Sequence, residues 1–222
     1  YKRQGITCGI IGTYTVARRT VFLSGGITHA SFGGLGIAFY LGINPILGAM
    51  AFAVASALGI EYVSSHGKIR EDSAIGLIWG IGMAVGALFM SLRPGYTSRD
   101  LSSFLFGNII TVTDTDVAAL AVTATILLVM TILWLRPIMY VAFDRNFSQA
   151  AGMHTKLISY TMSVITAVTI VLSIRVMGIV LLISLLTMPV VIVNFFSKSY
   201  KTITLWSAAV AAVAGVTGIV LS

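Results

Sequence analysis

Long apolar stretches separated by short polar connections limit most strongly what this chain can fold into. Eight such stretches can be marked, at residues 5–17, 25–41, 46–60, 73–92, 117–135, 157–174, 178–194 and 204–222. A helix that crosses a bilayer needs about 20 apolar residues, and backbone groups in lipid must be hydrogen-bonded within the segment. The runs also lack the alternation of a transmembrane β-strand. The predicted fold is therefore all-α, a polytopic transmembrane helical bundle of about eight spans, with the first span truncated.

The composition excludes several classes of protein. Charged residues make up 9% of the chain and hydrophobic residues 57%, whereas an ordinary globular domain carries about 25% and 45–50%. A soluble or disordered protein is therefore excluded. The single cysteine, Cys8, excludes an internal disulfide. The net charge of +7 comes from cations in small groups between apolar runs, so we expect a lipid bilayer rather than a nucleic acid as partner.

The cations also predict an orientation. With Arg18 and Arg19 in the cytoplasm, alternation of the spans places nine cations inside and five outside, with Arg175 in an outer connection. This bias follows the positive-inside rule. We expect one transmembrane domain over residues 1–222. We interpret the chain as a fragment that is incomplete at both ends, because the first stretch is short and the last has no polar tail.

Two connections between the predicted spans are long. The outer one, residues 93–116, has apolar residues three or four positions apart, which predicts a short amphipathic helix at the outer surface or mouth. Asp114 and Asp116 precede the next apolar run and are interpreted as its helix N-cap. The inner connection covers residues 136–156.

The second stretch contains an imidazole among glycines. Gly26, His29, Gly33 and Gly36 are spaced three or four apart, so they share one helix face, and small residues there allow close helix packing. His29 is thus expected to face the bundle interior. There it would either ligate a divalent transition metal or form a structural hydrogen bond to another helix.

The inner connection carries the pattern of a short helix. An aspartate begins it, small residues follow, and a glycine ends it. Such a helix would either enter a groove of a partner protein or lie on the membrane surface. The residues concerned are Phe143, Asp144, Phe147, Ala150, Ala151 and Gly152.

The seventh stretch contains Pro189, which removes a backbone hydrogen bond and favours a kink. Ser184 and Thr187 lie close to it in the sequence. These residues and Thr28 of the second stretch are candidates for lining a polar path through the bundle.

The sequence carries no nucleotide-binding motif of the Gly-x-x-x-x-Gly-Lys-Ser/Thr type. The chain is therefore not expected to be an enzyme, and any ATP hydrolysis that drives it would belong to another subunit. No Asp or Glu lies centrally in the predicted spans, which argues against a carrier driven by an ion gradient.

The chain resembles the permease subunits of bacterial ABC importers for zinc, manganese or iron, the ABC-3 family. Five motifs carry this resemblance, in the order and with the spacing that the family shows. They are Gly12-Thr13-Tyr14 through Arg18-Arg19, the Gly25–Gly36 stretch, Arg70 to Gly76, Leu105-Phe106-Gly107-Asn108, and Ser173 to Gly178 running on to Pro189.

The resemblance implies a homodimeric permease in the bacterial plasma membrane. It implies two bound ATPase subunits that use the ATP, and an extracytoplasmic metal-binding protein that delivers the ion. It also implies that residues 143–152 form the coupling helix held by the ATPase. No cofactor would be bound permanently, because the divalent metal ion is the substrate.

The resemblance further implies an ion site made by an Asp and a His four residues apart on the second helix. His29 matches the His, but Gly25 stands where the family has the Asp. We therefore expect a permease that moves zinc, manganese or iron inward by alternating access and contacts the ion through His29. The alternatives are an ABC permease for a metal chelate (siderophore, haem or cobalamin) and an ATP-independent ion-coupled carrier.

Overall fold

The computed structural model describes the backbone of residues 2–67, 69–92 and 113–221, and every regular element in these ranges is a helix. Five of the helices are long and apolar enough to cross a membrane: α2, α3, α4, α6 and α8. This confirms the prediction of a polytopic helical membrane bundle. The amphipathic helix predicted in residues 93–116 falls mostly outside the described residues. The helices are α1 Lys2–Ala17, α2 Val21–Leu41, α3 Pro45–Ser65, α4 Glu71–Ser91, α6 Asp114–Phe143, α7 Arg145–Ala150, α8 Thr155–Phe196 and α9 Tyr200–Leu221.

The helices form two compact units. Unit 1 comprises Tyr1–Val21, Thr111–Ser159 and Val180–Ser222, and unit 2 comprises Phe22–Ile110 and Tyr160–Ile179. Unit 1 thus contains α1, α6, α7, α9 and both ends of α8. Unit 2 contains α2, α3, α4 and the middle part of α8.

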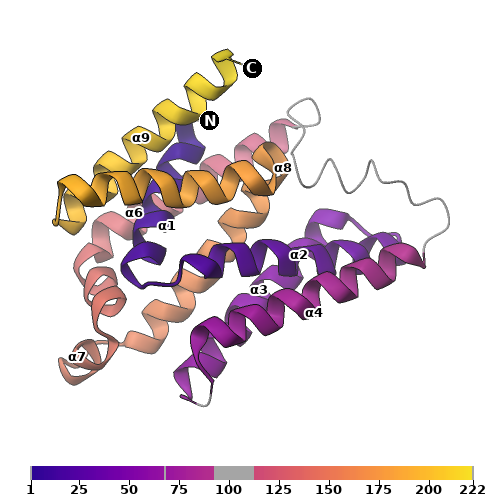
Figure 1. Ribbon diagram of the computed structural model, residues 1–222, viewed down its shortest axis with the longest axis horizontal. Helices are drawn as coiled ribbons and strands as arrows, with labels where there is room; N and C mark the ends of the chain where they lie inside the picture. Colours follow the sequence, from indigo (N-terminus) through magenta and orange to yellow (C-terminus); the bar gives the residue numbers. More distant parts are fainter. Residues whose placement is uncertain (1, 68, 93–112, 222) are drawn as a thin grey trace. The chain divides into compact units, whose positions relative to one another are not determined.

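In unit 1, glycines bring α1 close to its neighbours. A Cβ atom at Gly5 would lie 2.5 Å from the Cα of Ala212 on α9, and one at Gly12 would meet the carbonyl oxygen of Leu186 on α8. Figure 1 shows α1 beside α9 and α6. Because backbones can approach this closely only where side chains are absent, these glycines set the distance between the helices.

In unit 2, the glycine face predicted on the second stretch packs α2 against α4. Three glycines of α2 would each meet α4 with an added Cβ, and Gly34 is equally close to Gly48 of α3. The α2–α4 pairs are Gly26 with Ile75, Gly33 with Gly82, and Gly36 with Gly86. The small-residue face therefore determines which helices surround His29.

The predicted stretches 157–174 and 178–194 are one helix, α8, which is interrupted at Gly178. Gly178 has φ 74° and ψ 171°, a conformation that only glycine adopts readily. The predicted boundary between the two stretches is confirmed, because the break at Gly178 separates two helical segments. Arg175, however, lies in the last turn of the first segment rather than in a connection. Pro189 lies within the second segment of α8, and the residue of α8 with non-helical angles is Gly178.

Helix α6 extends eight residues past the predicted end at residue 135 and ends at Phe143. A kink with non-helical angles at Trp134 lies three residues before Pro137, whose ring clashes with the preceding turn. The N-cap of α6 is Thr113 rather than an aspartate. Asp116 completes the capping box by accepting a hydrogen bond from the Thr113 backbone N–H at 2.9 Å.

Candidate functional site

His29 lies on α2 with its imidazole stacked on the indole of Trp79 of α4. The ring centroids are 4.4 Å apart and the ring planes differ by 7°. The side chain of His29 is half-buried. Because the stack uses the face of the imidazole, the two ring nitrogens stay at the edge, where a metal binds. The contact therefore orients His29 without using its ligating atoms.

The environment of Gly25 has room for a side chain. An added Cβ there would meet Trp79 Cζ3 at 3.8 Å, which is an ordinary van der Waals contact. By contrast, a Cβ on the adjacent Gly26 would collide with Ile75. The glycine at position 25 is thus not required by helix packing. The position matters because the ABC-3 resemblance implies an aspartate metal ligand there.

The hydroxyl groups around His29 on α2 are occupied within the helix. Thr28 donates to the carbonyl of Ser24 at 2.6 Å, and Ser31 donates to the carbonyl of Thr28 at 2.6 Å. Both side chains are buried. Their oxygens can still accept hydrogen bonds, but both hydroxyl groups already donate to carbonyls of α2 and therefore cannot donate to a ligand.

The other candidate pathway residues lie in the C-terminal part of α8. Ser184 donates to the carbonyl of Val180 at 3.0 Å, and Thr187 donates to that of Ile183 at 2.9 Å. Pro189 is buried and Ser184 is exposed on the single chain. They belong to unit 1, whereas Thr28 and His29 belong to unit 2. Their role in a pathway stays a prediction.

Sequence reasoning missed a buried carboxylate. Glu61 on α3 is 1% exposed, and the Ser163 hydroxyl on α8 donates to its Oε2 at 3.4 Å. The predicted third span ended at residue 60, one residue too early to include it. Glu61 lies near the C-terminal end of α3, so the prediction that no acidic residue lies centrally in a span holds for the described helices.

Across the residues that the structure describes, no group of three or more His, Cys, Asp or Glu side chains converges to hold a metal ion. A structural zinc site needs four such ligands. Within this part of the chain, the arrangement can therefore offer a transient imidazole contact but not a closed metal cage.

The predicted short helix of the inner connection is α7. Asp144 caps it by accepting a hydrogen bond from the Phe147 N–H at 2.9 Å, and Gly152 follows with φ 78°. Phe147 is 60% exposed, and Ala150 and Ala151 are also exposed. Phe143 instead ends α6 and packs edge-to-face on Tyr200 of α9, with ring centroids 6.1 Å apart. The exposed apolar face is the kind that a partner groove receives.

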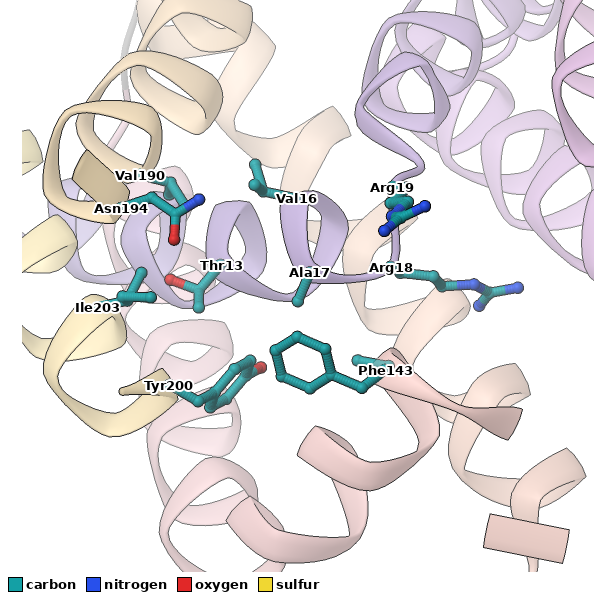
Figure 2. A pocket seen from close by; sticks show the side chains of 11 residues that line it. Thr13, Val16, Ala17, Arg18, Arg19, Phe143, Val190, Asn194, Tyr200 and Ile203 are labelled. Atoms are coloured by element: carbon teal, nitrogen blue, oxygen red, sulfur yellow. The ribbon is translucent and has the colours of Figure 1, made fainter. Parts of the chain in front are cut away.

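The connection between α1 and α2 lies at the same end of unit 1 as α7. Arg18 and Arg19 line a cavity together with Ala142 and Phe143 (Figure 2). The predicted orientation placed both the arginine pair and residues 143–152 in the cytoplasm. The cavity places Arg18, Arg19 and Phe143 at the same end of unit 1, since opposite sides of a membrane could not share one cavity.

Comparison with models of known protein families assigns the chain to a family. The model of the ABC 3 transport family matches residues 4–222. The chain belongs to the ABC 3 transport family. As a member of this family, it is a multi-pass membrane protein, in agreement with its apolar helices.

Several named proteins are similar to this chain. A probable metal transport system membrane protein of Chlamydia muridarum is 37% identical over 204 residues, covering 89% of this chain and 69% of that protein. The manganese import system permease protein ScaB of Streptococcus parasanguinis is 30% identical, with 97% and 76% covered. The solved structure of PsaBC from Streptococcus pneumoniae in complex with a Fab matches with a TM-score of 0.83 and 26% identity, covering 99% of this chain and 79% of that one.

Trp79 is a site residue that the sequence did not reveal. Tryptophan is common in apolar helices, and nothing in the spacing of α4 links it to a histidine some 50 residues earlier. The contact depends on how closely α2 and α4 pack. The glycine spacing on α2 was the one available signal, and it indicated a close partner helix without identifying it.

Proposed function

We propose that this chain is the permease subunit of an ABC importer that moves a divalent transition-metal ion into the cytoplasm. The half-buried imidazole of His29, stacked on Trp79 and carried by a helix packed through glycines, is the observation that carries this proposal. The names of similar proteins support a metal substrate, and ScaB is named as a manganese permease. Manganese is therefore the first ion to test.

The chemistry of the site fits a passing ion. An ion in such a pathway must bind well enough to lose water and weakly enough to leave. One imidazole meets both requirements better than a closed ligand cage. In the proposed homodimer, the second copy would supply a second imidazole.

The missing carboxylate bears on which metal is moved. Carboxylate oxygens suit manganese, whereas imidazole suits zinc and iron. With Gly25 in place of an acid, we propose that the site discriminates less against zinc and iron than one with a carboxylate would. This is testable, because a Cβ at position 25 makes only an ordinary contact with Trp79 on α4.

Coupling to ATP hydrolysis would pass through α7. Its exposed side, with Phe147, Ala150 and Ala151, has the form of a helix that enters a groove of an ATPase subunit. Nucleotide binding by that subunit would move α7 and, through it, the helices of unit 1. An extracytoplasmic binding protein would deliver the ion on the opposite face.

The test is uptake into vesicles by the permease reconstituted with its ATPase. We expect ATP-dependent accumulation of manganese, zinc or iron(II), and His29→Ala should reduce it at least about 10-fold, as removal of a metal ligand contact does. His154→Ala is the matched control, because this histidine lies exposed at the start of α8. Gly25→Asp should shift the preference towards manganese.

Three outcomes would contradict the proposal. Uptake unchanged by His29→Ala would remove His29 from the ion pathway. Uptake of a siderophore, haem or cobalamin in place of the free ions would favour the chelate importer. Accumulation that persists after ATP depletion would favour an ion-coupled carrier, against which membership in an ABC transport family already argues.

A further inference from the structure

A cavity of about 480 Å³ lies in unit 1 where α1 ends. The proposed transport of metal does not use it. Arg18 and Arg19 lie on one side of it, and Asn194 and Thr13 lie on the other, as Figure 2 shows. Phe143 and Tyr200 form its lower edge in this view. Its volume far exceeds that of a single anion, so a larger ligand must be considered.

One wall of the cavity is apolar. Val190 and Ile203 belong to a buried cluster against which Val16 packs, and all three line the cavity. Arg18 and Arg19 lie at the opposite side, and the Arg18 side chain extends outward from the other lining residues (Figure 2). A cavity with hydrocarbon on one side and cations on the other suits an amphiphilic anion better than a carboxylate of another protein.

The backbone at Arg19 points to a role for its side chain. The end of α1 is closed by hydrogen bonds from the Arg19 N–H to the Val16 carbonyl at 3.0 Å and from the Thr20 N–H to the Thr15 carbonyl at 2.9 Å. This is the Schellman pattern, in which glycine is usual at the left-handed position. Arg19 occupies it with φ 62°, the one positive φ found outside glycine in the described residues.

An arginine at this position is conformationally disfavoured relative to glycine. An outlier of this kind suggests a function for the side chain. Arg18, the preceding residue, donates from Nη1 to the Tyr14 hydroxyl at 3.1 Å. The turn therefore presents two cations side by side at the rim of the cavity.

Further cations surround this end of unit 1. Lys198 and Lys201 flank Tyr200 and are exposed, and Lys156 at the start of α8 is exposed as well. Asp144 is the sole acidic residue between residues 117 and 222. The local charge is thus strongly positive, on the face that the positive-inside rule places in the cytoplasm. Basic pockets between membrane helices on that face suit lipid phosphates.

We propose that this cavity binds the headgroup of an anionic phospholipid from the inner leaflet. The phosphate lies between Arg18 and Arg19, and the glycerol ester region lies along Val16, Val190 and Ile203. The phospholipid joins the ends of α1, α8 and α9 beside the last turn of α6. This site is independent of which ion the permease moves, and it does not depend on the role of His29.

The test uses the complete permease–ATPase complex in nanodiscs of phosphatidylcholine with or without phosphatidylglycerol. Native mass spectrometry counts the retained phosphatidylglycerol, and thermal denaturation reports whether it stabilises the complex. Arg19→Gly removes one cation and relieves the left-handed residue, so the variant should fold at least as well as the wild type. We expect about 5-fold weaker retention for Arg19→Gly and roughly 30-fold for Arg18→Gln with Arg19→Gly, since each cation near an anionic membrane surface adds about a factor of five.

Lys156→Gln is the matched control, because it removes one charge from the same unit but lies outside the cavity. Equal loss of phosphatidylglycerol in Lys156→Gln and Arg19→Gly would overturn the proposal. So would binding of inorganic phosphate as tight as that of the lipid, measured in phosphatidylcholine nanodiscs. Loss of the ATPase from Arg19→Gly with unchanged lipid retention would assign the arginines to the ATPase contact instead.

Discussion

The imidazole of His29 and the indole of Trp79 lie face to face, 4.4 Å apart between ring centroids and within 7° of parallel. One ring belongs to α2 and the other to α4, so the stack joins two helices that glycines already hold close together. A stacked imidazole cannot turn freely about its side-chain bonds. Trp79 therefore acts as a positioning residue for the proposed ion contact.

Trp79→Leu should weaken metal uptake by loosening His29. Aromatic pairs contribute about 0.5–1.5 kcal/mol beyond burial, so the half-saturating ion concentration should rise roughly 2- to 12-fold. Trp79→Phe should retain most of the effect, because it keeps an aromatic face. Trp206→Leu on α9 removes another exposed tryptophan and serves as control. An identical shift in all three variants would mean that the stack does not position the imidazole.

Gly36→Ala should destabilise unit 2. The added Cβ would lie 2.6 Å from the carbonyl oxygen of Gly86 on α4, and overpacking of this kind costs about 1–3 kcal/mol. Gly80→Ala on α4 is the control, since its Cβ would meet nothing within 4 Å. Thermal unfolding in detergent should show a lower melting temperature for Gly36→Ala alone. Equal melting temperatures would contradict the close packing of α2 on α4.

Gly178→Ala should distort or destabilise the break in α8. Its φ of 74° with ψ 171° is a region that residues with a Cβ avoid, and forcing a side chain there costs about 1–3 kcal/mol. Pro189→Ala should have no such cost, because Pro189 lies within regular helix and alanine restores a backbone donor. Relative to the wild type, Gly178→Ala should therefore lower the free energy of unfolding, whereas Pro189→Ala should raise it slightly. A neutral Gly178→Ala would argue that the break is not fixed by this residue.

Asp144→Ala should weaken α7. It removes the hydrogen bond that the Asp144 carboxylate accepts from the Phe147 N–H, which is worth about 1 kcal/mol for a helix cap. If α7 transmits nucleotide binding, stimulation of the ATPase should fall several-fold. Asp144→Asn keeps the cap without the charge and should behave like the wild type. A defect as large in Asp144→Asn would show that the charge matters rather than the cap.

Several features could be predicted because each depends only on residues that are close together in the sequence. Helix α4 was expected at residues 73–92 and is found at Glu71–Ser91, since a long apolar run has no other stable form in lipid. The position of α7 followed from an aspartate that caps its first turn and a glycine that ends it. The close face of α2 followed from the spacing of its glycines.

Predictions failed where two local signals competed. The sequence singled out Pro189 for a kink, whereas the residue of α8 with non-helical angles is Gly178, which can adopt a positive φ. The sequence predicted a boundary at residues 175–177, whereas the break in α8 is confined to Gly178 and Arg175 is still helical. The third apolar stretch was marked only to residue 60, whereas α3 continues to Ser65 and buries Glu61.

The sequence by itself determined that this chain forms apolar helices, which of them carry small-residue faces, and where the cations gather. Those properties depend on residues within a few positions of each other. Only the tertiary structure decided that His29 meets Trp79, that Glu61 meets Ser163, and that Arg18 and Arg19 open on the cavity beside Tyr200. These contacts join residues far apart in the chain, and their geometry depends on how closely the helices pack rather than on the spacing within any one of them.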